Sequence, residues 1–467
     1  MVFSSLFFLS VFLPLNLFLY YITKSINVRN IILVVFSLFF YAWGEPIWIS
    51  LLIFSALVDY LNGLFIDKYR DRPVAKLGIF ITLFINLGLL FTFKYSDFIV
   101  ENFNFLFNTS FSKPGFLLPI GISFYTFQTI SYSIDVYKGE VKAQKNFLNF
   151  LMFVSLYHQL VAGPIVRYSV IENEINNRKF YWDDFSSGVT RFSKGLFKKV
   201  LIANVAGEIV QQFLEKDIVD MTSISAWFGI SMYAIQIYFD FSGYSDMAIG
   251  LGKMFGFHYD ENFKHPYTST SIGDFWRRWH ISLGTFFRDY LYIPLGGNKR
   301  NVYLNLFIVW FCTGFWHGAS WNFIIWGLYF CVLLIAERLF VNQLLDKSYI
   351  IIKHFYALFF IVIGWAIFYF TDLEKLFDFL GLLFGINGFI LSDIEVATVI
   401  KENIIWLLFA LLFSTPVYNY SINYLNSVKL RFLKTNYLIL LMNIIMLFTS
   451  IAMLVNKTYN PFIYFRF

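Results

Sequence analysis

The sequence predicts an all-α protein that crosses a membrane several times. Of its 467 residues, 58% are hydrophobic and only 14% are charged, whereas an ordinary soluble domain is about 45–50% apolar and about 25% charged. Aromatic side chains make up 22% of the chain, which suits a lipid-facing surface with interfacial belts. Apolar runs close to the length of a membrane span recur from one end to the other. This composition excludes a water-soluble enzyme, a disordered chain, a collagen and a coiled coil.

Eleven or twelve apolar runs are candidate membrane spans, because a span needs about 20 predominantly apolar residues. The run 147–160 either spans or re-enters, and 376–384 is short. The run 3–21 lacks a basic leader and a small-residue cleavage site, so we expect a retained transmembrane helix rather than a removed signal peptide. With 147–160 and 376–384 included, thirteen apolar runs occur: 3–21, 31–43, 47–64, 77–93, 117–134, 147–160, 224–249, 303–315, 321–340, 349–369, 376–384, 404–418 and 437–454.

Basic residues between the runs predict the orientation, because Lys and Arg concentrate in cytoplasmic loops. Lys24 and Arg29 follow the first run, and the loop 68–76 is also basic. Both loops are therefore expected in the cytoplasm, with the N-terminus and the polar stretch 96–113 outside the membrane. Three basic residues precede the last run and predict an outside C-terminus: Lys429, Arg431 and Lys434.

The net charge of +6 does not indicate nucleic acid as a partner, because the basic residues lie in short loops rather than along one stripe. Cys312 and Cys331 both lie in apolar runs. Two cysteines predict neither a disulfide framework nor a Cys-based metal site, and no metal or bound cofactor is expected.

The segment 192–213 is predicted to form an amphipathic helix on the inner leaflet, because its apolar residues recur at helical spacing. Arg191, Lys194 and Lys198 recur at intervals of three and four residues. One interpretation is a solvated basic face beside anionic lipid. The other is a funnel that attracts a phosphate-bearing cytosolic donor.

The stretch 259–300 is too charged to cross lipid as a simple helix, with six Lys or Arg and four Asp or Glu. We expect it to be buried in protein or to line a wet cavity. No internal repeat or soluble-domain linker is visible. The sequence therefore predicts one domain over 1–467, with a charged re-entrant region at about 259–321 that carries the reactive groups.

His317 is the first candidate for chemistry, since an ionisable group at membrane depth is costly and marks function. It lies between two apolar runs, with Gly318, Ala319 and Ser320 after it, so a ligand can come close to the backbone there. A desolvated imidazole stays neutral, as a general base must be. The alternative is an interfacial histidine hydrogen-bonded between Trp316 and Trp321.

His280 is the second candidate and ends a segment in which aromatic and charged residues alternate. A buried or cavity-lining position would give it a role beside His317. The alternative is structural, with Asp274, Arg277 and Arg278 in an ion-pair network and His280 bonded to a backbone group.

Asp240 and Asp246 lie where an apolar run meets Ser and Gly. They are helix caps, a proton relay or partners for Arg277 and Arg278, and the cap or ion-pair interpretation is favoured. Asp59 with Asn62, Arg167, and Arg288 with Asp289 are interpreted as polar contacts between helices, and the other four histidines as structural. No serine-hydrolase elbow, zinc-hydrolase helix, phosphate-binding loop or His-x-x-x-x-Asp acyltransferase dyad is present.

Several blocks resemble the membrane-bound O-acyltransferase (MBOAT) family, and within it the alginate O-acetyltransferase branch. The matches extend over essentially the whole chain and include the C-terminal FIYFRF. The blocks are SIGDFWRRWHISL at 271–283, RDYLYIPLGG at 288–297, FWHGASW at 315–321, PIGISFYTFQ at 119–128, DVYKGE at 135–140, GPIVR at 163–167 and YFDFSGYSD at 238–246.

The resemblance implies a helical fold around a central tunnel, with His317 catalytic and His280 the second member of the pair. It also implies transfer of an acyl group, most often acetyl, from a cytosolic thioester such as acetyl-CoA or an acyl carrier protein. The acceptor would be an extracytoplasmic polysaccharide, reached through a partner transferase with a serine nucleophile. Oxyanion donors are left open among the backbone near Gly318 and the side chains of Trp321 and Asn322.

Two alternatives remain open at this stage. One is the branch of the same family that esterifies teichoic acid with D-alanine. The other is a proton-coupled transporter or flippase that uses the intramembrane Asp and His residues, for which inverted repeats would be the signature and none is visible.

Overall fold

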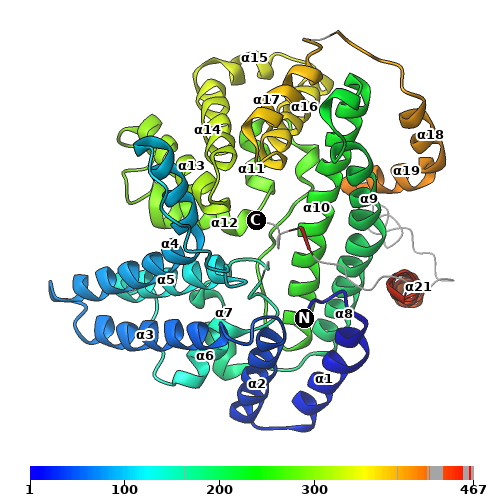
Figure 1. Cartoon of the computed structure of the whole chain (residues 1–467). Helices are drawn as coiled ribbons and strands as arrows, with labels where there is room; N and C mark the ends of the chain where they lie inside the picture. The colour runs from blue at the N-terminus through cyan, green and yellow to red at the C-terminus, as the bar shows by residue number, and fades with distance from the viewer. Residues whose placement is uncertain (162, 387, 418–419, 421–434, 456–461, 464–467) are drawn as a thin grey trace.

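The computed structural model describes every residue except 162, 387, 418–419, 421–434, 456–461 and 464–467. All regular structure in these described residues is helical, which confirms the all-α class. The long helix α10 packs beside α8 and α9, and Figure 1 shows α2, α3 and α5–α7 in the lower part of the view and α11 and α13–α17 in the upper part. Lys429, Arg431 and Lys434, on which the expected outside C-terminus depends, lie outside the described residues.

The helices vary in length from five to 33 residues. Short segments with the wider π-helical turn precede α1 and continue α8, α12 and α14. The bounds are α1 (Leu13–Ile22), α2 (Ile26–Gly44), α3 (Ile49–Lys68), α4 (Ala75–Phe107), α5 (Ile122–Lys138), α6 (Phe147–Ser155), α7 (Tyr168–Asn177), α8 (Trp182–Phe197), α9 (Asn204–Leu214), α10 (Ser223–Met254), α11 (Ile272–Arg278), α12 (Ile281–Phe287), α13 (Val302–His317), α14 (Trp321–Ala336), α15 (Asn342–Asp346), α16 (Ile350–Tyr369), α17 (Leu373–Leu383), α18 (Ile394–Glu402), α19 (Ile404–Ser414) and α21 (Thr435–Val455).

Six of the described helices are long and apolar enough to cross a membrane, or seven if the bent pair α18 and α19 counts as one span. The six are α2, α3, α4, α14 with its extension to Asp346, α16 and α21. The count from sequence is larger, because several apolar runs fold as shorter helices such as Phe8–Ile22 and α13. The chain is a multi-pass membrane protein.

The structure defines two segments whose form the sequence left open. The polar stretch 96–113 begins within α4, which continues as one 33-residue helix to Phe107. The run 147–160 forms only the nine-residue α6, about 14 Å long, which is too short for a hydrocarbon core of about 30 Å. It therefore does not span the membrane on its own.

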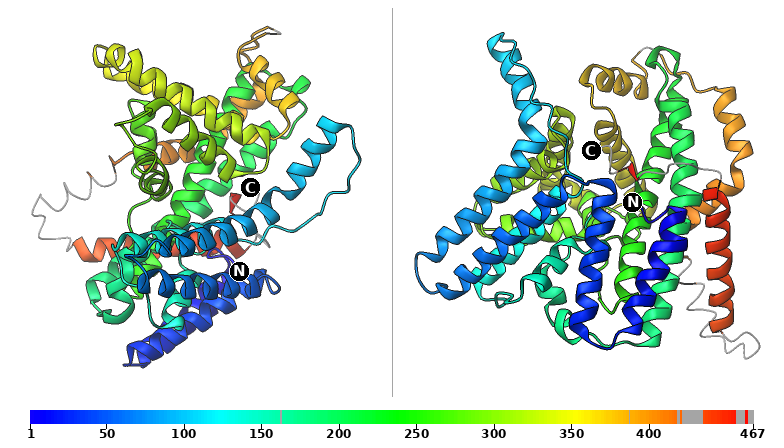
Figure 2. Two further views of the ribbon diagram at one scale, coloured as in Figure 1. Left: turned by 90° about the vertical axis from the view of Figure 1, so that its left-hand side faces the viewer. Right: turned by 60° about the horizontal axis from the view of Figure 1, so that its bottom comes forward.

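Glycines let α8 and α10 approach each other closely. A Cβ atom on Gly195 would lie 2.5 Å from the carbonyl oxygen of Gly243, and one on Gly188 would lie 2.7 Å from that of Gly250. Small residues at such intervals let helix backbones meet within a membrane. On its other face α8 contacts α21, which stands at the edge of the molecule in Figure 2.

The charged stretch 259–300 folds as loops and two seven-residue helices, α11 and α12. Each is about 10 Å long, so neither can cross a membrane. A small cluster of buried apolar side chains joins α12 to α5 and to the end of α13, and it includes Phe127, Phe286 and Trp316. This packing places His280, which precedes α12, beside the end of α13.

Candidate active site

His317 is the last residue of α13, and the chain after it is extended at Gly318. Its half-buried imidazole is surrounded edge-on by three aromatic rings: Trp316 at 4.9 Å, Trp326 at 4.9 Å and Phe368 at 5.2 Å between centroids. Within the described residues, neither ring nitrogen has a hydrogen-bond partner. Packing against these three rings therefore orients the imidazole.

His280 directly precedes α12 in a left-handed conformation, with φ +45° and ψ +53°. Such a backbone is uncommon for a residue other than glycine and costs about 1–3 kcal/mol, so the surrounding contacts must enforce it. The side chain is 4% exposed. Burial lowers the pKa of His280 to about 3, so the imidazole is neutral at physiological pH.

Asn262 holds the His280 ring. The Oδ1 atom of Asn262 lies 3.3 Å from Nδ1 of His280 and also accepts from the backbone N–H of Ser282 at 3.1 Å and from its hydroxyl at 3.0 Å. The Nδ2 atom of Asn262 donates to Ser245 at 3.1 Å. These bonds orient the amide, so His280 donates from Nδ1 and keeps Nε2 as an acceptor.

Trp316 lies between the two histidines. Its ring centroid is 6.2 Å from that of His280 and 4.9 Å from that of His317. The indole is 4% exposed, and its N–H has no hydrogen-bond partner among the described residues. The structure therefore brings together two imidazoles that are 37 positions apart in the sequence, with an unsatisfied donor beside them.

Two cavities flank α12. One of about 520 Å³ is lined by His280, Arg277, Arg288 and Thr313, among others. The second, of about 450 Å³, is lined by polar residues of the segments 164–170 and 260–264 together with Ser282. His317 is not among the residues that line either cavity.

Trp321 and Asn322 do not present free donors to the site. The indole N–H of Trp321, whose side chain is 49% exposed, donates to Asn102 at 2.9 Å. The fully buried Asn322 amide donates to the carbonyl oxygens of Ile367 and Phe368, both at 3.2 Å. Of the oxyanion donors that the sequence left open, these two are already engaged, and the backbone near Gly318 remains.

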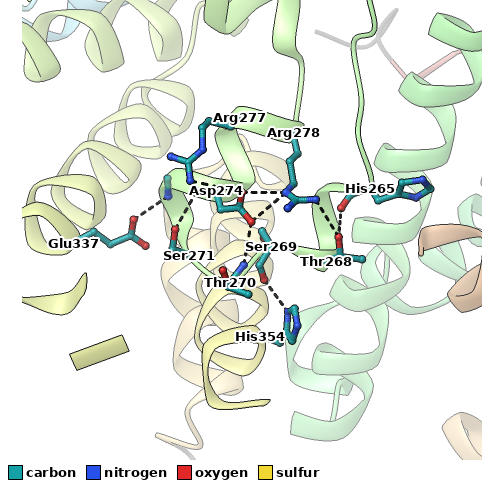
Figure 3. Close-up of polar contacts among 11 residues, drawn as sticks. His265, Thr268, Ser269, Thr270, Ser271, Asp274, Arg277, Arg278, Glu337 and His354 are labelled. Atoms are coloured by element: carbon teal, nitrogen blue, oxygen red, sulfur yellow. Dashed lines mark hydrogen bonds and ion pairs between the residues drawn. The ribbon is translucent and has the colours of Figure 1, made fainter. Parts of the chain in front are cut away.

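Asp274, Arg277 and Arg278 form an ion-pair network within α11 (Figure 3). The Arg278 Nε atom lies 3.0 Å from Asp274 Oδ1, and the mostly exposed Arg277 lies 3.6 Å from the same oxygen. The buried carboxylate of Glu337 accepts from the backbone N–H groups of Ile272 and Gly273 at the start of the helix. This network supports the structural interpretation for Asp274, Arg277 and Arg278, whereas His280 contacts the side chain of Asn262. Only Arg277 of the three ionic side chains lines the cavity beside His280.

Asp240 and Asp246 contact lysine and arginine from α8 and its extension instead of Arg277 and Arg278. Asp246 pairs with Arg191 and Lys198, each at 2.6 Å. Asp240 pairs with Lys199 at 2.5 Å and accepts from the backbone N–H of Ile463 at 2.6 Å. Both act as ion-pair partners.

These contacts also correct the expectation for the segment 192–213. Arg191 and Lys198 point toward α10, so the face expected to be solvated, or to attract a phosphate, is turned partly into the protein. The segment itself is the end of α8, a π-helical stretch at Lys198–Ala203 and α9.

Sequence reasoning missed three residues that shape the site: Asn262, Glu337 and Lys94, whose ammonium contacts the end of α13. Asn262 and Glu337 had no local pattern to mark them. Lys94 had a signal, because it is a charged residue directly after the apolar run 77–93. No group of three or more His, Cys, Asp or Glu side chains that could hold a metal occurs in the described part of the chain.

Comparison with known proteins shows which family the chain resembles. The model of the family described as MBOAT, membrane-bound O-acyltransferase family, matches residues 140–377. The probable alginate O-acetylase AlgI of Pseudomonas putida is 39% identical over 497 residues, with 100% of both chains covered. The peptidoglycan O-acetyltransferase of Helicobacter pylori is 35% identical over 83% of this chain and 80% of that protein. The teichoic acid D-alanyltransferase of Bacillus subtilis is 29% identical over 47% of this chain and 59% of that protein.

The family model and the full-length relatives show the family: the chain belongs to the membrane-bound O-acyltransferase family and is an acyltransferase.

Proposed function

We propose that this protein moves an acetyl group from a cytosolic thioester to the outer side of a bacterial inner membrane, for O-acetylation of a polysaccharide. The observation that carries the proposal is the pair of imidazoles, His280 and His317, on either side of Trp316. Names of relatives that act on alginate and peptidoglycan support a polysaccharide as the final acceptor.

His317 acts as the general base. A hydroxyl is a poor nucleophile at neutral pH, so a ring nitrogen of His317 takes its proton while the oxygen bonds to the carbonyl carbon of the thioester. The carbon–sulfur bond then breaks, and the leaving thiolate takes the proton back from the imidazolium. Assistance of this kind accelerates a reaction by about 10²–10⁴-fold. The unpartnered ring nitrogens of His317 fit this role.

His280 supports the reaction as a second neutral imidazole. Asn262 engages its Nδ1, which leaves Nε2 to accept a hydrogen bond from a substrate group. The tetrahedral intermediate also needs donors for its oxyanion. We assign this role to the backbone N–H groups near Gly318 and to the unsatisfied indole N–H of Trp316.

The cavities suggest routes for the two substrates. The two that flank α12 lie beside the charged stretch 259–300 and would admit the donor, either acetyl-CoA or an acyl carrier protein. A third cavity of about 610 Å³ is lined by the turn at Gly44 and Glu45 and by the start of α5. The positive-inside rule predicts that this turn lies on the outer side of the membrane. The hydroxyl of a partner transferase would enter there.

Inverted membrane vesicles supplied with labelled acetyl-CoA test the proposal, together with the partner and the polysaccharide. His317→Ala should abolish transfer, and His280→Ala should cause a smaller but clear loss. His258→Ala, at an exposed histidine that contacts Glu174 and Asp184, should not change the rate. Carrier proteins loaded with acetyl or with D-alanyl groups are tested in parallel as alternative donors.

Each part of this experiment has a result that would contradict the proposed function. Normal acetylation by a correctly inserted His317→Ala protein would overturn the role of His317. Transfer from the D-alanyl carrier alone would replace acetylation with teichoic acid esterification. Flux of a solute without label in any acceptor would point to a transporter.

A further inference from the structure

One face of α4 holds the chain on both sides of His317. The Lys94 Nζ atom donates to the carbonyl oxygens of Trp316 at 2.6 Å and His317 at 3.0 Å. The hydroxyl of Tyr95 donates to the carbonyl of Phe315, and their rings stack with centroids 4.0 Å apart. The last three residues of α13 are thus bound through their carbonyl groups by two consecutive residues of a neighbouring helix.

The same face of α4 also contacts the start of α14. Asn102, two helical turns beyond Lys94, accepts from the indole N–H of Trp321 at 2.9 Å. The ring of Phe98 packs against Trp321 with centroids 5.7 Å apart. Figure 1 shows α4 passing beside α13. The short connection that carries His317 is therefore held by α4 at both of its ends.

Lys94 brings its ammonium group to the C-terminal end of α13. The last carbonyl groups of a helix have no partner within it and carry partial negative charge, so a cation there is favourable. In the described part of the chain, no carboxylate lies within ion-pair distance of Lys94, while its ammonium lies 5.8 Å from the centroid of the Trp316 ring. A half-buried charge in a membrane helix is costly and by default marks function.

We propose that Lys94 is a positioning residue for the acyl transfer. Its ammonium binds the two terminal carbonyls of α13 and so orients the His317 imidazole toward the reacting hydroxyl. The proposal rests on the proposed function of His317 as the general base. It assigns Lys94 no contact with substrate.

The expected loss of rate on replacing Lys94 follows from the mobility of helix ends. The last turn of a helix frays when its carbonyls lose their partners. A displacement of about 1 Å at a catalytic group can cost about 10²-fold in rate. Because such a change affects the chemical step more than substrate binding, it lowers kcat while KM is preserved.

The test compares Lys94→Met, Lys94→Arg and Lys94→Gln in the purified full-length protein, with labelled acetyl-CoA as donor. Lys94→Met should lower kcat about 100-fold, with KM for the donor changed by less than about threefold. Lys94→Arg keeps a cationic donor for both carbonyls and should restore most of kcat. Lys94→Gln keeps N–H donors without charge and should lie between the two.

Lys113→Met is the matched control. Lys113 follows α4 on the exposed surface, where it pairs with Glu101, so its loss should leave kcat and KM unchanged. Size-exclusion profiles check that every variant is folded. If Lys94→Met does not fold, Lys94→Gln and Lys94→Arg decide the question, since both keep the hydrogen-bond donors.

Two results would overturn the proposal: wild-type kcat in folded Lys94→Met or Lys94→Gln, or a variant in which only KM rises. The His317→Ala protein is measured in the same experiment. Acetyl transfer by His317→Ala would refute the proposed function itself, whereas loss with His317→Ala and none with the Lys94 variants would refute only the positioning role.

Discussion

The side-chain oxygen of Asn262 lies 3.3 Å from Nδ1 of His280, and it accepts from two groups of Ser282 as well. Three donors converge on one carbonyl oxygen, so the amide has one orientation and the imidazole one tautomer. The left-handed backbone at His280 persists because these bonds hold its side chain and the residue two positions after it. Asn262 is 18 positions upstream of His280 and carries no local sign of this role.

Removing Asn262 should therefore reduce acyl transfer without removing any reacting group. We expect Asn262→Ala to lower the turnover rate about 10–100-fold, because the His280 ring loses its fixed orientation. Initial rates with labelled acetyl-CoA measure the change. The control is Asn298→Ala, at an exposed asparagine in the same charged stretch. A turnover rate for Asn262→Ala equal to that of the control would contradict the assignment.

We expect the loss of either partner of the buried ion pair Lys199–Asp240 to destabilise the fold. Their side chains are 4% and 2% exposed, so removal of one partner leaves an uncompensated buried charge, which costs about 3–5 kcal/mol. We expect Lys199→Met to lower the thermal midpoint strongly. Lys199→Met with Asp240→Asn should recover part of the loss, because both charges are then gone. Additive losses in a double-mutant cycle would show that the two residues do not interact.

His258 should make stability depend on pH. Burial opposes its charged form, but the carboxylates of Glu174 and Asp184 outweigh burial and raise the pKa of His258 above its usual value. A raised pKa in the folded state stabilises the fold below the unfolded pKa of about 6.5, and this gain is lost as the pH rises through the folded value. His258→Gln should lower the thermal midpoint at about pH 6 and change it little at about pH 9. The reverse dependence would contradict these contacts.

Impermeant labelling tests the orientation. Single cysteines replace Thr109, after α4, and Asp71, before it, in a protein that lacks Cys312 and Cys331; both sites are exposed. The positive-inside rule predicts that a membrane-impermeant maleimide labels position 109 in intact cells and position 71 only after lysis. Labelling of position 71 in intact cells would reverse the predicted topology.

The sequence by itself determined the class of the protein and led to two candidate histidines. Composition and apolar runs suffice for an all-α membrane protein, because hydropathy reflects solvent and needs no knowledge of packing. His317 is visible because an ionisable group between apolar runs is costly wherever it lies. The motifs around His280 and His317 carried the family, which the comparisons confirmed.

Only the tertiary structure decided which partner each charge has and how many apolar runs are long enough to span. Arg191 and Lys198 look like a basic face in sequence, yet they pair with Asp246 across the α8–α10 contact. The role proposed for Lys94 depends on its contact with the end of α13, 222 positions away. Hydropathy and helical spacing describe a helix relative to its solvent, whereas ion pairs and helix-end contacts depend on which helices become neighbours. That is set by close packing, such as the glycine contacts between α8 and α10.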